Sequence, residues 1–313
     1  MAFELPVEFE NRMRAMLGGE YEAFRAEYEK PHRRGVRLNT LKCDAETLAR
    51  TLPFPLAPTP FSPLSYYAPE AVRMASLPLY HAGAFYSQEP SASSAVTLLD
   101  PQPGEKVLDL CAAPGGKSTQ IAALTGDRGL LWSNEVVRSR ASALASNLER
   151  MGVKNAVVSS VYPEVLAEKL EGYFDRVLVD APCSGEGMFR RDPQAIAEWS
   201  PAHVEACAAR QLAILGSAAR CVREGGVLVY STCTFSEEEN EGVVRAFLRE
   251  NPGFVLEKPD VAFGRPAYGV DAVRIFPMDG GEGHFAARFR RTAPNGYAAR
   301  PYDEKPDRQT EAA

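Results

Sequence analysis

From Glu105 onward, short apolar runs alternate with longer stretches in which apolar residues recur at helical spacing. Short apolar runs are typical of buried strands, and the periodic stretches are typical of amphipathic helices. Because the two alternate over about 185 residues, the pattern predicts an α/β fold with a doubly wound sheet and right-handed crossovers. The predicted strands are Lys106–Leu110, Leu130–Asn134, Ala156–Ser159, Arg176–Asp180, Val227–Ser231, Phe254–Glu257, Val273–Phe276 and His284–Phe289, and the predicted helices are Lys117–Leu124, Arg138–Met151, Pro163–Leu170, Pro201–Val222 and Glu237–Glu250.

Two helix starts have clear sequence signals. Ser200 followed by Pro201 predicts an N-cap with proline at the first helical position. Ser236 with Glu239 predicts a capping box, in which the Glu239 carboxylate reaches back to the backbone N–H of Ser236.

The first hundred residues have a different pattern of polar, apolar and proline positions. Val7–Leu17 and Glu20–Lys30 have the pattern of polar helices, and the five prolines of Pro53–Pro63 favour an extended connector. The sequence therefore predicts a smaller N-terminal α+β domain over residues 1–100 and a larger domain over residues 101–291. The tail over residues 292–313 lacks an apolar face and is expected to be disordered.

Composition narrows the class of protein. Of the 313 residues, 45% are hydrophobic and 24% are charged, which is the mix of an ordinary globular protein. The longest apolar runs fall far short of the ~20 residues that span a bilayer, and the N-terminus has acids where a signal peptide needs basic and then apolar residues. We therefore expect a cytoplasmic protein that does not contact membranes.

Cysteine spacing and charge set further limits. The six cysteines include no CxxC pair and there are only four histidines, so neither a metal site nor a disulfide framework is expected. The net charge of -6 disfavours sequence-blind binding of nucleic acid, so contact with a polyanion requires a local patch. A cluster without an acid offers such a patch, although a solvated surface is the other interpretation; it contains Lys30, Arg33, Arg34, Arg37 and Lys42.

Candidate chemistry lies just after the predicted strands, since ligands of open α/β sheets bind at the carboxyl ends of the strands. The first strand ends near Asp109 and leads into a turn with Gly115 and Gly116, where a backbone can approach a ligand closely. The turn matches neither GxGxxG nor a phosphate-binding loop, and close helix packing is an alternative reason for its glycines. Glu135 follows the second strand and is placed to accept hydrogen bonds from ribose hydroxyls, which favours an adenosine-bearing cofactor.

Two cysteines also follow strand ends. Cys183 comes after the fourth strand and Cys233 after the fifth. A single free cysteine is more often a small buried hydrophobe than a nucleophile, but two at equivalent places, with Asp180 three residues before one of them, favour a reactive pair. Packing is the expected role of the others, namely Cys43, Cys111, Cys207 and Cys221.

Three long segments follow the predicted strand ends, namely DLCAAPGGK (Asp109–Lys117), DAPCSGEGMFRRDP (Asp180–Pro193) and STCTFSEEENEGVV (Ser231–Val244). They resemble the corresponding segments of the RNA cytosine-5 methyltransferases of the Sun/Nop type. Within that family the sequence is most similar to the RsmF-like enzymes for small-subunit ribosomal RNA. The similarity extends from about Gly35 to Arg291. Enzymes of this type continue into a C-terminal RNA-recognition domain, so this sequence is expected to be either a short form or a fragment. The similarity implies a Rossmann-like class I methyltransferase sheet, a smaller N-terminal RNA-binding domain, and ribosomal RNA or the small ribosomal subunit as partner.

The resemblance also implies residue roles. Cys233 would be the nucleophile, Cys183 would assist release of the product, and Asp180 would lie where cofactor and base meet. Where many relatives contact the adenine with an acid or an amide, this chain has serines, so Ser159 or Ser160 would serve there. The residues expected to bind S-adenosylmethionine are Asp109, Cys111, Ala112, Ala113, Pro114, Gly115, Gly116, Lys117, Glu135, Ser160 and Asp180.

Covalent catalysis is consistent with these residues. Carbon 5 of cytosine is too weak a nucleophile to accept a methyl group from a sulfonium unaided, and a thiolate that adds at carbon 6 raises its electron density. The addition places negative charge toward ring nitrogen 3, where a protonated Asp180 could donate, and burial favours that protonation.

The target base has to leave its stack to reach such a pocket, so a single-stranded or loosely paired cytosine is expected. The segment Gly185–Trp199 could form a wall over it, and a surface connector is the other interpretation of this segment. Its RNA-facing candidates are Phe189, Arg190, Arg191 and Trp199.

Three other functions fit the residues less well. An exocyclic-amine methyltransferase typically has two prolines after an Asn or Asp, where this chain has Asp180-Ala-Pro-Cys. A cysteine hydrolase needs a histidine partner, and neither His203 nor His284 has a motif context. A catalytically idle RNA-binding ribosome assembly factor with the same fold would be expected to lose a motif cysteine, and both are present. We expect a monomeric methyltransferase.

Overall fold

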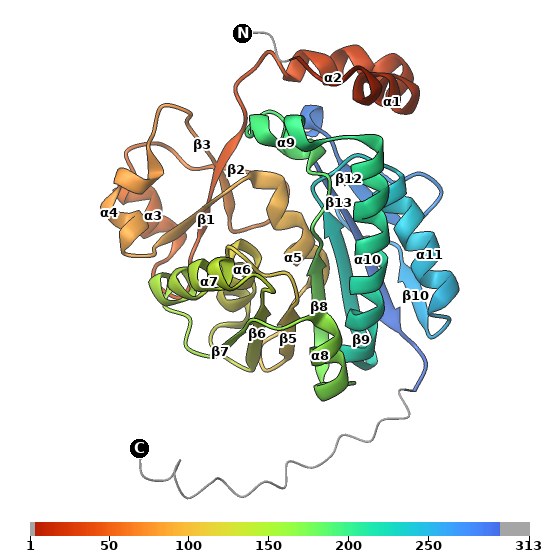
Figure 1. Ribbon diagram of the computed structural model, residues 1–313. Helices are drawn as coiled ribbons and strands as arrows, with labels where there is room; N and C mark the ends of the chain where they lie inside the picture. The colour runs from red at the N-terminus through yellow and green to blue at the C-terminus, as the bar shows by residue number, and fades with distance from the viewer. Residues whose placement is uncertain (1–3, 295–313) are drawn as a thin grey trace, which may run out of the picture.

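The computed structural model describes residues 4–294, and its centre is a 9-stranded sheet (Figure 1). The strand order is β11-β12-β13-β9-β8-β5-β6-β7, with β10 paired to β13. The neighbouring strands β9, β8, β5, β6 and β7 run parallel to one another. In contrast, β13 runs antiparallel to β9, β10 and β12. The bounds are β5 Lys106–Asp109, β6 Leu130–Asn134, β7 Ala156–Ser159, β8 Phe174–Asp180, β9 Val222–Thr232, β10 Phe254–Glu257, β11 Arg265–Pro266, β12 Ala272–Ile275 and β13 His284–Arg291.

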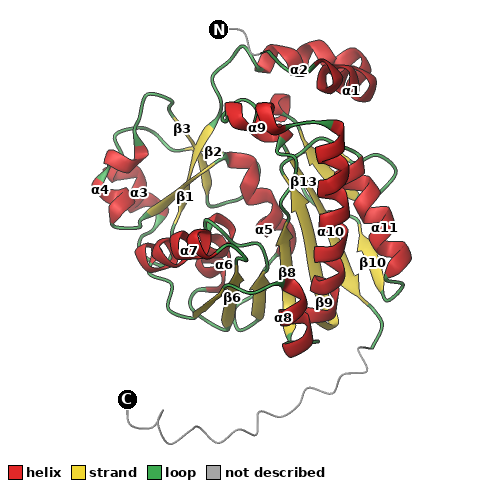
Figure 2. Ribbon diagram, viewed as in Figure 1, coloured by secondary structure: helices red, strands yellow, loops and turns green. Residues whose placement is uncertain are grey.

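Helices cover both faces of this sheet (Figure 2). Successive residues of β8 alternate between the faces: Val177 and Val179 pack in one buried cluster and Leu178 packs in the other. This alternation explains why the strands are apolar throughout, because each face needs its own core. One cluster includes residues of α8 Pro163–Lys169, α10 Pro201–Cys221 and α11 Val243–Glu250; the other includes residues of α5 Ser94–Leu99, α6 Gly116–Thr125 and α7 Arg138–Met151.

The N-terminal part consists of a helix pair and a small antiparallel sheet. The apolar side of the helix pair packs on Phe189, Trp199, Phe235 and Phe276 of the larger part. The small sheet has the order β2-β3-β1-β4 and its own core. The elements are α1 Val7–Leu17, α2 Tyr21–Glu27, β1 Arg34–Leu38, α3 Ala45–Thr51, β2 Ala57–Pro58, β3 Ser65–Ala68, α4 Pro78–His81 and β4 Phe85–Gln88.

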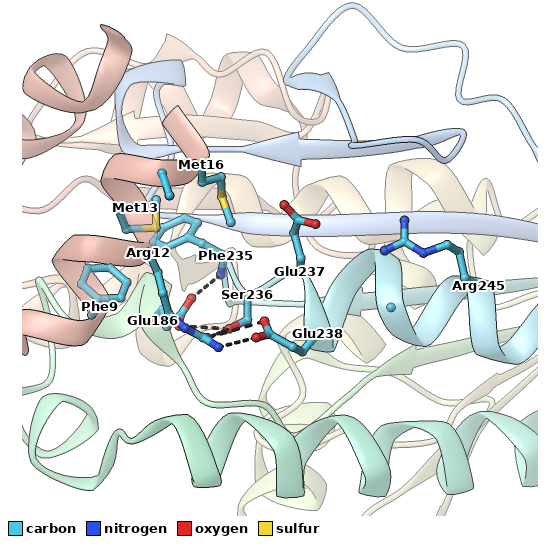
Figure 3. Close-up of a pocket in the computed structure, with 12 residues that line it drawn as sticks. Phe9, Arg12, Met13, Met16, Glu186, Phe235, Ser236, Glu237, Glu238 and Arg245 are labelled. Atoms are coloured by element: carbon cyan, nitrogen blue, oxygen red, sulfur yellow. Dashed lines mark hydrogen bonds and ion pairs between the residues drawn. The ribbon is translucent and has the colours of Figure 1, made fainter. Parts of the chain in front are cut away.

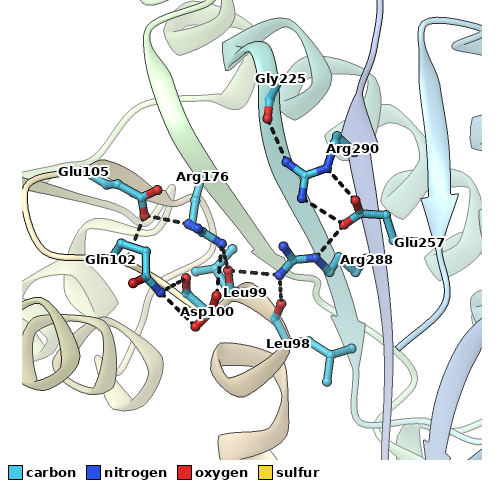
Figure 4. A network of polar contacts seen from close by, with 10 residues as sticks. All are labelled: Leu98, Leu99, Asp100, Gln102, Glu105, Arg176, Gly225, Glu257, Arg288 and Arg290. Atoms are coloured by element: carbon cyan, nitrogen blue, oxygen red, sulfur yellow. Dashed lines mark hydrogen bonds and ion pairs between the residues drawn. The ribbon is translucent and has the colours of Figure 1, made fainter. Parts of the chain in front are cut away.

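Arginines fix α5 to the large sheet (Figure 4). Arg176 of β8 donates to the carbonyl of Leu99, and Arg288 of β13 donates to the carbonyl of Leu98. The last carbonyls of a helix lack partners within the helix, and cations near them are favourable. The contacts therefore cap α5 and anchor the segment that enters the first parallel strand.

The predicted doubly wound α/β fold is confirmed, with strand and helix positions within a few residues of those expected. Ser200 accepts a hydrogen bond from the His203 backbone N–H at 3.1 Å, which confirms that N-cap. The capping box is wrong: the chain forms a π-helix, η5 Glu238–Gly242, and the Glu239 carboxylate bonds to Ser184 instead.

The predicted tail lies outside the described residues from position 295 onward. At its start, the backbone N–H of Thr292 donates to the carbonyl of Gly253 at 2.8 Å. In the part of the chain that the structure describes, we find no helix with the length and apolarity that a bilayer crossing requires.

Candidate active site

The sequence-predicted site residues converge at the carboxyl ends of the parallel strands. β5 lies between β6 and β8, and the chain passes from β5 outward to β7 before it returns to β8. Such a reversal of strand order opens a crevice between the strand ends. A cavity of 620 Å³ lies there, lined by Cys111, Glu135, Asp180, Cys183 and Cys233 among others.

The two strand-end thiols meet in this cavity. Cys183 Sγ lies 3.3 Å from Cys233 Sγ, with one thiol in the loop after β8 and the other in the loop after β9. The hydrogen bond with Cys233, together with burial, raises the pKa of Cys183 well above its ordinary value. Cys183 therefore stays protonated and can donate its S–H to a thiolate on Cys233. All six cysteines are free thiols.

Asp180 lies beside these thiols as an ionised carboxylate, so the expectation of a protonated Asp180 is wrong. Its Oδ2 accepts from Lys117 Nζ at 2.6 Å and its Oδ1 accepts from the Ser231 hydroxyl at 2.8 Å. Burial by itself would raise the pKa of Asp180, but the positive charge of Lys117 and these hydrogen bonds outweigh it and lower the pKa. The cationic donor in contact with Asp180 is Lys117.

His284 was missed by the sequence reasoning, because it lies on an antiparallel strand outside any cysteine motif. β13 pairs with β9, which brings His284 Nε2 to 3.7 Å from Asp180 Oδ1. Burial lowers the pKa of His284 to about 3, so its imidazole is neutral beside the carboxylate. Only the sheet pairing could have revealed this neighbour.

Glu135 lies at the other end of the cavity. Its side chain is nearly buried, accepts from the Val137 backbone N–H at 2.9 Å and forms an ion pair with Arg140 at 3.3 Å. A buried carboxylate at the end of the second parallel strand can accept hydrogen bonds from vicinal hydroxyls of a ligand. Tyr162 and Glu164 line the cavity nearby and were not singled out from the sequence.

The serines expected at the adenine end have other partners. The Ser160 hydroxyl donates to the Val136 carbonyl at 3.1 Å, and Ser159 bonds to Trp132 and Asn134. Neither serine lines the cavity of 620 Å³.

The turn after β5 forms the wall between this cavity and a smaller one of 280 Å³. Cys111 and Ala113 line both, and Ala112, Pro114, Gly116 and Lys117 line the smaller one. Asp109 is fully buried behind the turn, where it accepts from Ser118 at 2.7 Å, and burial raises its pKa to about 7.

The two glycines of the turn permit close packing. Gly115 has φ of 106°, which glycine adopts without strain, and a Cβ there would lie 3.2 Å from Leu144 of α7. A Cβ on Gly116 would lie 3.3 Å from the Gln88 amide of β4. The packing explanation therefore holds for both glycines, and Gly116 also lines the smaller cavity.

Two of the expected RNA-facing cations are buried, and the expectation is wrong for them. Arg37 is 1% exposed and donates to Gln88, to the Gly116 carbonyl and to Thr119, so it joins the small sheet to α6. Arg190 forms a buried ion pair with Glu282 at 2.8 Å. Both side chains stabilise the packing of the N-terminal part on the larger part.

The aromatic RNA-facing candidates are buried as well. Phe189 is fully buried and Trp199 is 6% exposed, and both contact α1 and α2 through the shared apolar cluster. Within residues 185–199, Arg191 is the cation that is exposed. The segment is thus a packed wall with one outward cation.

The other basic side chains differ in their surroundings. Lys30 and Arg33 form ion pairs with Glu27 at 2.8 and 3.0 Å. Lys42 donates to two backbone carbonyls at the surface. Arg34 lines a groove of 430 Å³ together with His32, Arg33 and Arg191, and this groove meets the smaller cavity at Gln88 and Glu89.

A separate cavity of 540 Å³ lies between α1 and η5 (Figure 3). Arg12 crosses it to reach Glu238 and Ser236, and Phe9 and Met13 form its apolar side. It does not include the two strand-end thiols, so it is distinct from the candidate site. Among residues 4–294 no three or more His, Cys, Asp and Glu side chains are grouped to hold a metal ion.

Comparison with known protein families gives matches over most of the chain. Residues 96–290 match the family described as 16S rRNA methyltransferase RsmB/F. Residues 5–90 match the N-terminal domain of 16S rRNA methyltransferase RsmF.

Individual relatives agree with these matches. The chain is 39% identical over 305 residues to ribosomal RNA small subunit methyltransferase F of Enterobacter sp. (strain 638). The aligned region covers 92% of this chain and 63% of that protein. A solved methyltransferase homolog protein from Pyrococcus horikoshii is 29% identical with a TM-score of 0.80, covering 91% of this chain and 94% of its own. NSun6 from Pyrococcus horikoshii, solved with SFG, shares the fold at 24% identity and a TM-score of 0.83, covering 94% of this chain and 100% of its own. The chain spans under two thirds of the length of the Enterobacter relative.

Proposed function

Because the chain belongs to the RsmB/F family of 16S rRNA methyltransferases, we propose that it methylates carbon 5 of a cytosine in small-subunit ribosomal RNA through a covalent cysteine adduct. The observation that carries the proposal is the pair of free thiols, 3.3 Å apart, at a cavity that also holds Glu135 and Asp180. An idle assembly factor has no need of two thiols at this distance. The same proposal includes a monomer that acts in the cytoplasm.

S-adenosylmethionine is the methyl donor that this site fits. The cavity volume of 620 Å³ is in the range of small-molecule sites. Glu135 would hold the ribose hydroxyls, and the backbone from Cys111 to Ala113 would line the donor. When bound, the donor supplies a methyl group from its sulfonium.

Cys233 is the proposed nucleophile and Cys183 its partner. The Cys233 thiolate adds to carbon 6 of the cytosine, and carbon 5 then takes the methyl group. Transfer of the carbon 5 proton to a water molecule restores the double bond between carbons 5 and 6 and breaks the bond from carbon 6 to sulfur, so that Cys233 leaves as a thiolate. Since Cys183 keeps its proton, its S–H can stabilise the leaving thiolate 3.3 Å away.

Lys117 stabilises the negative charge that develops in the base, and Asp180 orients Lys117. The ammonium of Lys117 can donate toward ring nitrogen 3 or the adjacent oxygen, where the addition places negative charge. Asp180 fixes the direction of Lys117 through the contact at 2.6 Å and can accept from the exocyclic amine of cytosine. His284 lies behind Asp180 as a neutral imidazole, so Lys117 is the cation that keeps the Asp180 carboxylate ionised.

Single-stranded RNA would reach the site along the groove that contains Arg34 and Arg191. The groove adjoins the smaller cavity, which Asp180 lines, so phosphates beside the flipped cytosine can contact these two cations. The proposed RNA-positioning part of the chain is therefore residues 1–100 together with Arg191.

Bisulfite mapping of ribosomal RNA tests the function. A strain lacking this protein should lose 5-methylcytosine at one or more small-subunit positions, and the wild-type gene should restore it. A gene carrying Cys233→Ala is the matched control and should fail to restore the mark. An unchanged methylation map in the deletion strain would contradict the proposal.

A further inference from the structure

A π turn follows the Cys233 loop and directs polar side chains into the protein. η5 spans Glu238–Gly242, and its residues Glu239, Asn240 and Glu241 are fully buried. π turns re-aim helix side chains and are frequent at functional sites. Buried polar groups cost free energy unless they are hydrogen-bonded, so their partners indicate what the turn holds in place.

Glu239 holds the loop that carries Cys183. Its Oε2 accepts from the Ser184 backbone N–H at 2.9 Å and from Gln211 Nε2 at 2.8 Å. Gln211 Nε2 also donates to the Pro182 carbonyl at 3.0 Å. The backbone on both sides of Cys183 is therefore fixed by one carboxylate and one amide.

Asn240 holds the loop that carries Cys233 in the same way. Its Oδ1 accepts from the Thr232 hydroxyl at 2.6 Å, and its Nδ2 donates to the Thr234 carbonyl at 2.9 Å. These are the two residues on either side of Cys233. The hydroxyls of Ser184 and Thr234, 2.8 Å apart, join the two loops.

We propose that the adjacent residues Glu239 and Asn240 are separate positioning residues for the two thiols: Glu239, with Gln211, positions Cys183, and Asn240 positions Cys233. The inference rests on the proposed function, because it assigns each residue to one step of the cysteine chemistry. Neither Glu239 nor Asn240 lines the cavity of 620 Å³, so both act through the loops. Burial raises the pKa of Glu239 to about 7, because burial disfavours the charged carboxylate.

The two assignments predict opposite phenotypes in single-turnover reactions with protein-free 16S rRNA or 30S subunits from the deletion strain. Gln211→Met removes the donor of the Pro182 carbonyl and leaves Glu239 with only the Ser184 backbone N–H, so release should slow by about tenfold while adduct formation stays within about threefold of wild type. Its denaturation-resistant protein–RNA complex should accumulate on gels. Asn240→Ala should slow adduct formation by about tenfold and accumulate no complex.

Conservative variants distinguish an effect of lost hydrogen bonds to the loops from an effect of the Glu239 charge or of incomplete folding. Glu239→Gln keeps an acceptor oxygen for Ser184 and Gln211, so its release should stay within about threefold of wild type. Glu237→Gln, at an exposed position immediately before this turn, is the matched control. Calorimetric binding of S-adenosylmethionine checks folding, and if Gln211→Met fails this check, Gln211→Glu, which has the same size, replaces it in the comparison.

The outcomes distinguish this inference from the proposed function. Equal loss of adduct formation in the Gln211 and Asn240 variants, or turnover like that of Glu237→Gln in both, would overturn the separate roles. Failure of both Cys183→Ala and Cys233→Ala to trap any complex would instead overturn the proposed function.

Discussion

We expected functional residues in two regions: the edge of the large sheet where the thiols lie, called the rim, and the basic segment at residues 30–42. The structure supports the expectation at the rim more fully than in the basic segment. At the rim, Cys183, Cys233 and Asp180 lie together beside one cavity. In the basic segment, Arg37 is buried, Lys30 and Arg33 pair with Glu27, and Arg34 lines a groove.

The difference comes from what fixes each side chain. A residue just after a parallel strand has its place set by the strand, because all such ends share one edge of the sheet. A long cationic side chain can instead reach acids and carbonyls from distant parts of the chain, as Arg190 does with Glu282. The position of a residue after a strand therefore predicts its place in the structure better than the charge of its side chain does.

The largest effect is expected at the thiols. Cys233→Ala removes the nucleophile, so methylation should fall by at least about a thousandfold with no adduct. Cys183→Ala should instead trap a denaturation-resistant protein–RNA complex, which denaturing gels detect. Cys43→Ser, outside the cavity, is the control, and the reverse pattern for the two site cysteines would exchange their roles.

Lys117→Met should lower kcat by about a hundredfold, because it removes a cation from the place where negative charge develops. In the wild type the lowered pKa of Asp180 keeps this group ionised from pH 5 upward, so Asp180 adds no acid limb there. Without Lys117, burial dominates and the pKa of Asp180 rises, so residual activity should decline as the pH falls through the raised value. A pH–rate profile checks this, with exposed Lys154→Met as control, and a profile with no new limb would contradict it.

Arg37→Met sharpens the contrast within the basic segment. Loss of the buried donor takes one hydrogen bond each from the Gln88 side chain, the Gly116 carbonyl and the Thr119 hydroxyl, which should lower the free energy of unfolding by roughly 2–4 kcal/mol. Urea denaturation measures the change, and RNA affinity of the folded variant should stay the same. The surface variant Arg50→Met should cost under about 0.5 kcal/mol, and an equal cost for both would refute a structural role for Arg37.

Glu135→Ala tests the cofactor end of the cavity. Removing a charge-assisted hydrogen bond of roughly 1.5–3 kcal/mol should weaken S-adenosylmethionine binding by about ten- to a hundredfold. Calorimetry measures the affinity, with exposed Glu149→Ala on the neighbouring α7 as the control. Unchanged affinity would mean that other groups hold the ribose.

The smallest effect is expected for the RNA-facing cations. Arg34→Ala combined with Arg191→Ala should weaken RNA binding by about tenfold and reduce the log–log salt slope by about 0.7 to 0.9 for each phosphate that is no longer neutralised. Cofactor affinity should not change, since neither arginine lines the cavity of 620 Å³. Exposed Arg249→Ala on α11 is the matched control, and a slope equal to that of the control would make both arginines ordinary surface residues.

The sequence by itself determined the class of fold, the strand ends and the residues that follow them. The period of the apolar pattern fixes which segments are strands, and the segments after strands hold Glu135, Asp180, Cys183 and Cys233 at one edge.

Only the tertiary structure decided which polar groups are charged, buried or shared between segments. Lys117 holds Asp180 ionised, β13 brings His284 beside it, and the π turn sends Glu239 to the Cys183 loop instead of to its own helix start. Each of these contacts joins residues far apart in the chain, and its free energy depends on burial and on partners that no local pattern contains.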